Sequence, residues 1–160
     1  MNSEKIAQIV ASHSLWLRSG GSSGERANLQ GARICDASLV GADLRSADLG
    51  SANLAGADLR GASFWGANLR SANLAGADLR WVDFTWADLR WVDFTGADLD
   101  GASLEHADLR EAIFRGAILR NAILAGANFQ NANLRGVNLA GVNLTGVDLA
   151  GVDIRGAIFD

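Results

Sequence analysis

The sequence contains no proline and only one cysteine, Cys35, among its 160 residues. A single cysteine excludes a framework of internal disulfides and is compatible with a reducing compartment. The sequence also lacks any run of about 18 apolar residues, and its N-terminus lacks the basic segment and apolar core that mark a secretion signal. These absences argue against membrane insertion and export, so we expect the protein to be cytoplasmic.

Groups that commonly carry out catalysis are also scarce. The only two histidines, His13 and His106, are far apart in the sequence, and no HExxH motif, cysteine pair or glycine-rich phosphate loop is present. Aspartates recur at intervals that would spread them over several faces of a regular structure, which disfavours a metal site. We therefore predict that the protein is not an enzyme and that it uses no cofactor or metal.

What the sequence has in excess is a period of five residues. Every position ending in 2 or 7, from Ala27 to Ala157, is alanine or valine. Every position ending in 4 or 9, from Leu29 to Phe159, is Leu, Ile or Phe, and no insertion shifts the register. Asp, Asn or Ser mostly precedes the large residue, and glycine is frequent at the end of each unit. Because a fixed period over most of a chain indicates a repeat architecture, this pattern decides the fold class.

A period of five matches neither an α-helix, with about 3.6 residues per turn, nor a long strand, in which side chains alternate. It fits a short strand followed by a bend. In the unit ADLRG at residues 57–61, alanine and leucine point to one side, while aspartate and arginine point to the other. Coils of such units, stacked about 4.8 Å apart, bury the large residues along a common axis. The absence of proline agrees with this arrangement, since nearly every backbone N–H then bonds to the next coil.

The run ADLRS ADLGS ANLAG ADLRG, residues 42–61, resembles the pentapeptide-repeat family, and the same pattern extends over residues 27–160. The resemblance implies an all-β solenoid, namely a right-handed quadrilateral parallel β-helix with four pentapeptides per coil. A repeat region of this length would then form six to seven coils.

Bulky residues agree with four faces per coil. Phe64 and Phe84 are 20 residues apart, as are Phe94 and Phe114. We therefore predict that each pair stacks along the axis.

Residues 1–26 lie outside the repeats and divide into a helical and a flexible part. Ser3 is a suitable N-cap, and the apolar residues that follow share one helical face. We expect this helix to cap the first coil, because the open end of a solenoid exposes unpaired strands. Trp16 would be its anchor and His13 a packing residue. SGGSSGER is typical of a flexible connection, after which residues 27–160 form the β-helix.

Tryptophans are concentrated in one coil. Trp81, Trp86 and Trp91 occupy the turn-forming slot on three successive corners, and Trp65 lies in an outward slot nearby. Because this slot suits a positive φ, which tryptophan disfavours, we predict that these three corners use a different turn. His106 would lie one coil beyond Trp86 and pack on it. The tryptophans either shield the coil or form a partner-binding belt, since tryptophan is common at interaction hot spots.

Isoleucine replaces Asp or Asn at Ile113, Ile118 and Ile123, which would place apolar side chains outward on three consecutive faces. Charge changes in the same region: nine acids and three arginines between residues 78 and 111 give a net charge of −6, whereas residues 112–147 contain no acid. Each acid either pairs with a nearby arginine or belongs to a surface that attracts a basic partner. Clustered outward isoleucines favour contact with another protein.

The C-terminal repeats, ending in DIRGAIFD, contain no helix that would cover the last coil. Ile158 and Phe159 would then lie at an open end, near Ile154 of the preceding repeat. We predict an isologous homodimer in which two such ends meet through these three residues.

These features favour a rigid, non-enzymatic scaffold that binds an unknown protein partner through its acidic, Trp-rich middle coil. The family resemblance implies an alternative, because some members mimic duplex DNA and bind DNA gyrase or another type II topoisomerase. The regularity of the repeats supports a third interpretation, an idealised or designed structural protein. Arginines that adjoin Asp or Asn, in a chain with a net charge of −4, disfavour direct binding of nucleic acid.

Overall fold

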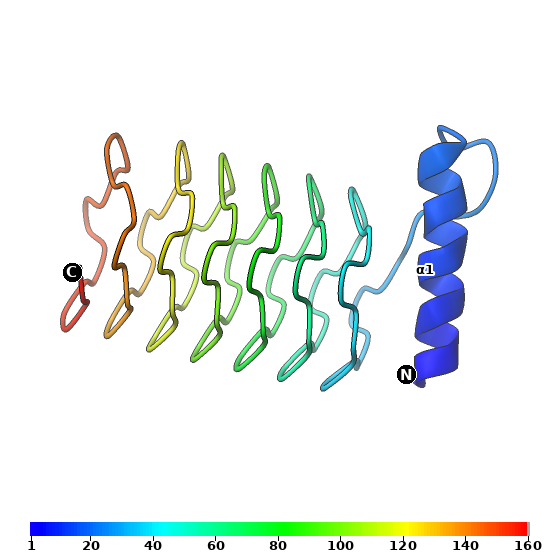
Figure 1. Cartoon of the computed structure of the whole chain (residues 1–160), viewed down its shortest axis with the longest axis horizontal. Coiled ribbons are helices and arrows are strands. Elements are labelled where there is room, and N and C mark those ends of the chain that lie inside the picture. Colours follow the sequence, from blue (N-terminus) through cyan, green and yellow to red (C-terminus); the bar gives the residue numbers. More distant parts are fainter. Residues whose placement is uncertain (160) are drawn as a thin grey trace.

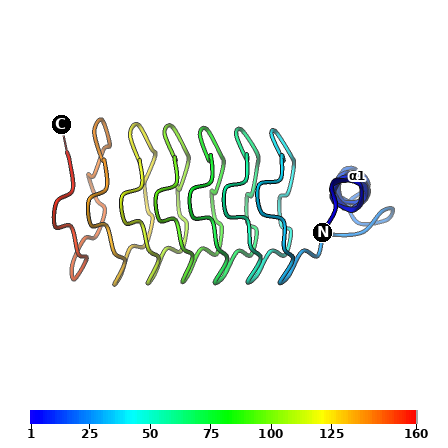
Figure 2. The ribbon, with the colours of Figure 1, turned by 90° about the horizontal axis from the view of Figure 1, so that it is seen from below.

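The computed structural model describes residues 1–159 and shows a rod with one helix at its N-terminal end (Figure 1). Helix α1 spans Ser3–Arg18, and the repeats that follow wind in successive coils toward the opposite end. Seen from below, the coils keep a similar outline along the rod, while α1 is viewed end-on (Figure 2). None of the described residues form a helix with the length and hydropathy needed to cross a membrane.

The coils are joined by single parallel bridges rather than by extended strands. Each bridge joins residues 20 positions apart, from Asn28↔Asp48 at one end to Asn138↔Ile158 at the other. Because each repeat has five residues, one coil contains four repeats and has four faces. The N–H of Leu29 donates to the carbonyl of Asp48 at 2.7 Å, and bonds of this kind recur along the rod.

We number the four faces after the large residue at the centre of each in the first coil. Face 1 is centred on Leu29, face 2 on Ile34, face 3 on Leu39 and face 4 on Leu44. Residues that follow at intervals of 20 lie on the same face, so the face of any residue can be read from the sequence.

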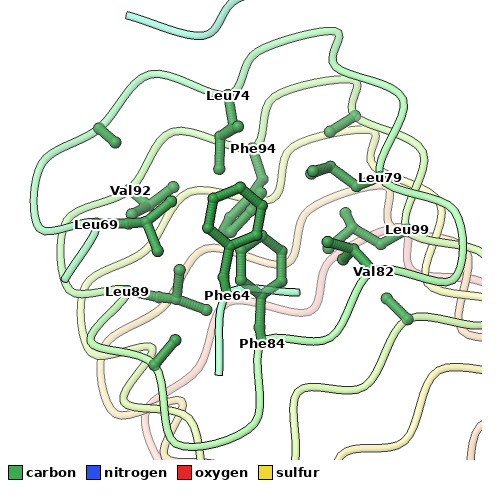
Figure 3. Packing of buried hydrophobic residues seen from close by; sticks show 14 of the residues in the cluster. Phe64, Leu69, Leu74, Leu79, Val82, Phe84, Leu89, Val92, Phe94 and Leu99 are labelled. Atoms are coloured by element: carbon green, nitrogen blue, oxygen red, sulfur yellow. The ribbon is translucent and has the colours of Figure 1, made fainter. Parts of the chain in front are cut away.

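The large residue of each repeat points inward and fills the lumen. Nearly all of these Leu, Ile and Phe side chains are buried, together with most of the small residues two positions before them. The predicted stacks are confirmed: ring centroids are 5.2 Å apart for Phe64 and Phe84 (Figure 3) and 4.6 Å apart for Phe94 and Phe114. Burial stabilises the coil by about 1.5–3 kcal/mol for each large side chain.

Corner residues adopt the left-handed conformation whether or not they are glycine. Glycines at the corners of the coils have φ values of 61–77°, and Trp81, Trp86 and Trp91 have values of 56°, 60° and 60°. The prediction of a different turn at the tryptophans is therefore wrong. The N–H of Trp81 donates to the next coil, and the N–H of Val82 donates to the carbonyl of Leu79 and closes the turn. Because a different turn would break such bonds, the stacked coils fix the corner geometry.

Helix α1 lies against the first coil. Ile6 is buried in the same apolar cluster as the lumen residues, and Val10 packs against that cluster. The N-cap is Asn2 and not Ser3, which corrects the prediction. The side chain of Asn2 accepts a hydrogen bond from the N–H of Lys5 at 3.0 Å, and Ser3 is already helical. Asparagine is among the best N-cap residues because its side-chain oxygen reaches this N–H.

His13 connects α1 to the coils by hydrogen bonds. The residue is 0% exposed, its Nδ1 accepts from the N–H of Ala27 at 3.1 Å, and its Nε2 lies 3.0 Å from the carbonyl oxygen of Arg45. Because Nδ1 accepts a bond, the ring is assigned as neutral with its proton on Nε2. Burial lowers the pKa of His13 from its ordinary value. Trp16 stacks on this ring with centroids 5.6 Å apart, so His13 does more than the packing predicted for it.

The last coil leaves its centre residues partly open. Ile154 and Phe159 are 40% and 45% exposed, although the equivalent residues in the middle of the rod are buried. On face 4, Ser103↔Ile123 is the final bridge in residues 1–159, and Ile123 is not bridged to Asn143. The C-terminal end of the rod is therefore apolar and less tightly joined than the middle.

Candidate protein-interaction surface

Exposed tryptophans frame face 4 in the middle of the rod. Trp81 lies at the corner between faces 3 and 4, Trp86 lies at the corner between faces 4 and 1, and Trp65 lies on face 4 one coil earlier. They are 64%, 58% and 47% exposed, respectively. Asp83 and Glu105 project from the same face. We call these five residues the face-4 surface.

Each corner indole of the face-4 surface contacts the next coil on one side only. The ring of Trp86 stacks on His106, as predicted, with centroids 4.3 Å apart and planes 18° apart. The indole of Trp81 covers Gly101, where a Cβ would lie 2.7 Å from the indole Cδ1, so a side chain at residue 101 would require the indole to move. The guanidinium carbon of Arg80 lies 5.7 Å from the ring centre of Trp81. More than half of each of the two tryptophans remains exposed to solvent.

Trp91 has a different environment. It lies at the corner between faces 1 and 2 and is the least exposed of these four tryptophans, at 41%. The guanidinium carbons of Arg70 and Arg90 lie 5.0 Å and 5.6 Å from its ring centre. Two cations of the chain itself therefore contact this ring. The structure does not bring Trp91 together with the face-4 surface.

The carboxylates of the face-4 surface lie beside residues other than arginine and lysine. Asp83 accepts bonds from the N–H of Thr85 at 2.9 Å and from the hydroxyl of Ser63 at 3.3 Å. Glu105 lies 3.9 Å from Nε2 of His106. Within residues 1–159, no arginine or lysine forms an ion pair with either acid. This surface therefore keeps its negative charge.

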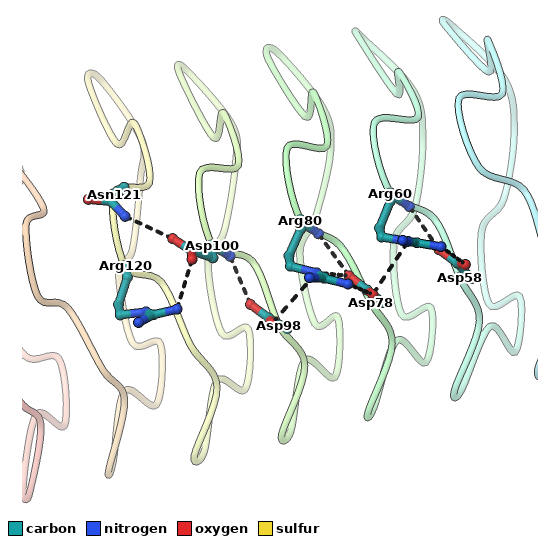
Figure 4. Close-up of polar contacts among 8 residues, drawn as sticks. All are labelled: Asp58, Arg60, Asp78, Arg80, Asp98, Asp100, Arg120 and Asn121. Atoms are coloured by element: carbon teal, nitrogen blue, oxygen red, sulfur yellow. Dashed lines mark hydrogen bonds and ion pairs between the residues drawn. The ribbon is translucent and has the colours of Figure 1, made fainter.

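On face 3, in contrast, arginine side chains neutralise the carboxylates. Arg60 Nη2 lies 2.7 Å from Asp58, Arg60 Nε lies 3.6 Å from Asp78, and Arg80 continues the chain to Asp98 (Figure 4). The hydrogen bond from Arg80 holds the pKa of Asp78 below its ordinary value. Local pairing thus describes face 3, whereas Asp83 and Glu105 on face 4 have no arginine or lysine partner among the described residues.

The three outward isoleucines are divided among three faces. Ile113 lies on face 2, Ile118 on face 3 and Ile123 on face 4. Ile113 and Ile123 are exposed, and Ile118 is half-buried. Only Ile123 shares a face with the face-4 surface, so the structure does not gather all three into one flat patch.

A metal site needs several His, Cys, Asp or Glu side chains close together. Cys35 is exposed, and among residues 1–159 no group of three or more His, Cys, Asp or Glu side chains is arranged to hold a metal ion. What the face-4 surface offers is indole faces beside carboxylates. This is the chemistry of noncovalent binding.

Stacked four-faced coils around an apolar lumen define the class of parallel β-helix solenoids. The sequence matches the family model for pentapeptide repeats, with 8 copies, over residues 25–61, 47–85, 87–126 and 122–160. The chain therefore belongs to the pentapeptide repeat family, whose members are right-handed quadrilateral β-helices. None of the curated proteins compared with the chain matches it.

Solved structures agree with this assignment. A pentapeptide repeat protein from the thylakoid lumen of Arabidopsis thaliana is 33% identical, with a TM-score of 0.57 over 64% of this chain and 74% of that protein. QnrB1, a plasmid-mediated fluoroquinolone resistance protein, is 21% identical, with a TM-score of 0.51 over 85% of this chain and 86% of QnrB1. At this level of identity, the similarity to QnrB1 is one of fold.

Proposed function

We propose that this protein is a non-enzymatic scaffold, a rigid rod of six to seven coils capped by α1, whose face-4 surface binds a basic segment of another protein. The observation that carries the proposal is the exposure of Trp81 and Trp86, at 64% and 58%, beside carboxylates that no arginine or lysine of the described residues neutralises. A left-handed conformation costs a non-glycine residue about 1–2 kcal/mol. Burial does little to offset this cost, since both residues remain more than half exposed.

Charge specifies the chemistry of the partner. Asp83 and Glu105 attract lysine and arginine side chains, because neither forms an ion pair with an arginine or lysine in the described part of the chain. A cation that approaches them can also lie over the free side of an indole, where the contact contributes about 0.5–1 kcal/mol at an exposed site. A segment rich in lysine and arginine satisfies both kinds of group. Ile123 adds apolar surface farther along the same face.

Removal of both corner indoles is expected to weaken binding of a short Lys/Arg-rich peptide at least about tenfold, the range of interaction hot spots. The variant is Trp81→Asn combined with Trp86→Asn, because asparagine tolerates the left-handed conformation. Binding is measured by fluorescence anisotropy of the labelled peptide with the full chain.

Trp91→Asn is the matched control, because it changes the same corner slot outside the face-4 surface. Its affinity for the basic peptide should equal that of the wild type, and an Asp/Glu-rich peptide of the same length should not bind. If the double variant bound the basic peptide as well as the wild type does, the proposed function would be wrong.

We also propose that two chains associate through the apolar C-terminal end, where Ile154, Ile158 and Phe159 are exposed. Phe159→Asp would place a charge in this contact and is expected to convert a dimer to a monomer. Sedimentation of the wild type and the variant at equal concentration measures the masses. Identical masses for the wild type and the variant would contradict the proposed dimer.

The second candidate function is a DNA mimic that binds DNA gyrase or another type II topoisomerase. The elongated coil that this chain shares with QnrB1, a fluoroquinolone resistance protein, favours it. The charge distribution weighs against it, because Arg60 and Arg80 neutralise the regular carboxylates of face 3 that would stand in for phosphates. The scaffold function therefore has the stronger support.

A further inference from the structure

A column of arginines lies on face 2, away from the face-4 surface. Arg115, Arg135 and Arg155 occupy the same slot in three successive coils. Stacked coils place equivalent residues about 4.8 Å apart, so three positive charges follow one another along the rod. Together with Thr95 and two corner glycines, they line an open cleft of about 440 Å³.

Two of these three arginines differ from most arginines of the rod in having no acid two residues earlier in the sequence. The common arrangement is that of Asp153 and Arg155, where an aspartate two residues earlier lies 2.6 Å from the guanidinium. In the corresponding slot, Arg115 has Ile113 and Arg135 has Asn133. Neither Arg115 nor Arg135 forms an ion pair within the part of the chain that the structure describes.

The remaining acids of face 2 do not fill the cleft. Asp93 accepts a hydrogen bond from the N–H of Thr95 at 2.9 Å, and Asp153 pairs with Arg155 while also attracting Arg135. Neither acid is among the residues that line the cleft. Residues 112–147 contain no acid at all. Like charges stacked at this spacing repel one another, and a bound anion would relieve the repulsion.

Glycines form the corner beside the arginine column. Gly116 and Gly136 line the cleft, and a Cβ added at residue 116 would meet no atom within 4 Å. Arg115 and Arg135 are both exposed on this open side. A ligand can therefore reach the guanidinium groups from the corner without any movement of the backbone.

We propose that Arg115, Arg135 and Arg155 form a binding site for a polyphosphate group, that is, two or three linked phosphates. The planar guanidinium presents paired N–H donors that match phosphate oxygens, and it remains charged at all physiological pH values. A ligand with several linked anionic groups can contact successive arginines, whereas a single carboxylate reaches fewer of them. The Thr95 hydroxyl is a further donor at the end of the column.

Calorimetric titration of the full chain with tripolyphosphate, at constant ionic strength in sodium chloride, tests the site. We expect saturable binding of one tripolyphosphate per chain. Arg115→Gln combined with Arg135→Gln should lower the affinity at least about tenfold, since each charge-assisted phosphate contact is strong. Arg110→Gln is the matched control and should leave the affinity unchanged, because that arginine is paired with Asp108 on face 1.

A second variant keeps both arginines but gives Arg135 an acidic partner. Asn133→Asp should create beside Arg135 the pair seen at Asp153 and Arg155, and so lower the affinity for tripolyphosphate. Titration with a nucleoside triphosphate distinguishes the source of the phosphates: equal affinity indicates the phosphate chain alone, and tighter binding indicates that the nucleoside contributes. Absence of saturable binding, or equal loss in the Arg110→Gln control, would overturn the proposal.

Discussion

Phe84→Ala is expected to lower the free energy of unfolding by about 3–5 kcal/mol, the range for removal of a buried aromatic ring. Phe84 is 0% exposed, stacks on Phe64 at 5.2 Å and meets the edge of Phe94 at 6.0 Å. Because the lumen is closed on four sides by backbone, the surrounding side chains cannot move inward to fill the cavity. Equilibrium unfolding in urea, followed by circular dichroism, measures the change.

Phe159→Ala is the control, because it removes the same side chain from the same slot where the coil is open. With 45% of Phe159 exposed, the expected change is much smaller, within about 1 kcal/mol. The comparison is made at a protein concentration low enough to exclude a dimer. Equal losses at residues 84 and 159 would show that the lumen is not the source of the stability.

His13→Ala is expected to lower the free energy of unfolding by about 1–3 kcal/mol, since a buried donor loses its partner. The N–H of Ala27 and the carbonyl of Arg45 both bond to the His13 ring. Hydrogen exchange of α1 should increase together with this loss, because the ring connects the helix to the coils. Leu15→Ala, on the exposed side of α1, is the control and should change stability far less.

The same site makes stability depend on pH. Burial lowers the pKa of His13 from 6.5, so the unfolded chain binds a proton more readily than the folded chain does. The hydrogen bond to the backbone carbonyl of Arg45 and the nearby carboxylate of Asp43 oppose this effect on the pKa, and the positive charges of Arg26 and Arg45 reinforce it. Stability is therefore complete above the unfolded value and declines as the pH falls below about 6.5. His13→Phe should flatten the decline, and an unchanged pH profile would contradict the buried neutral ring.

The register of the coils could be predicted from the sequence because one rule governs every repeat. A large apolar residue every fifth position leaves a single way to fill the lumen, and the intervals between Phe64 and Phe84 already indicated four faces. The position of His106 over Trp86 followed from the same interval. Residues whose numbers differ by 20 lie next to each other in adjacent coils, so these long-range contacts can be predicted from the sequence.

Features that depend on more than the repeat could not be predicted. The turn at Trp81 is set by hydrogen bonds to neighbouring coils, which override the preference of the residue itself. The partners of His13 lie 14 and 32 residues away, at the junction of helix and coil, where no period applies. The different surroundings of Trp91 depend on the rotamers of Arg70 and Arg90, which no sequence pattern specifies.

The measurement that most directly tests why the corner tryptophans are present is the free energy of unfolding of the Trp81→Asn/Trp86→Asn variant. If these indoles are held in a strained conformation for binding, relief of the strain offsets the lost contacts, and stability stays within about 0.5 kcal/mol of the wild type. A fall of about 2 kcal/mol or more would mean that the tryptophans are packing residues that stabilise the coil, and would contradict their assignment as a binding surface.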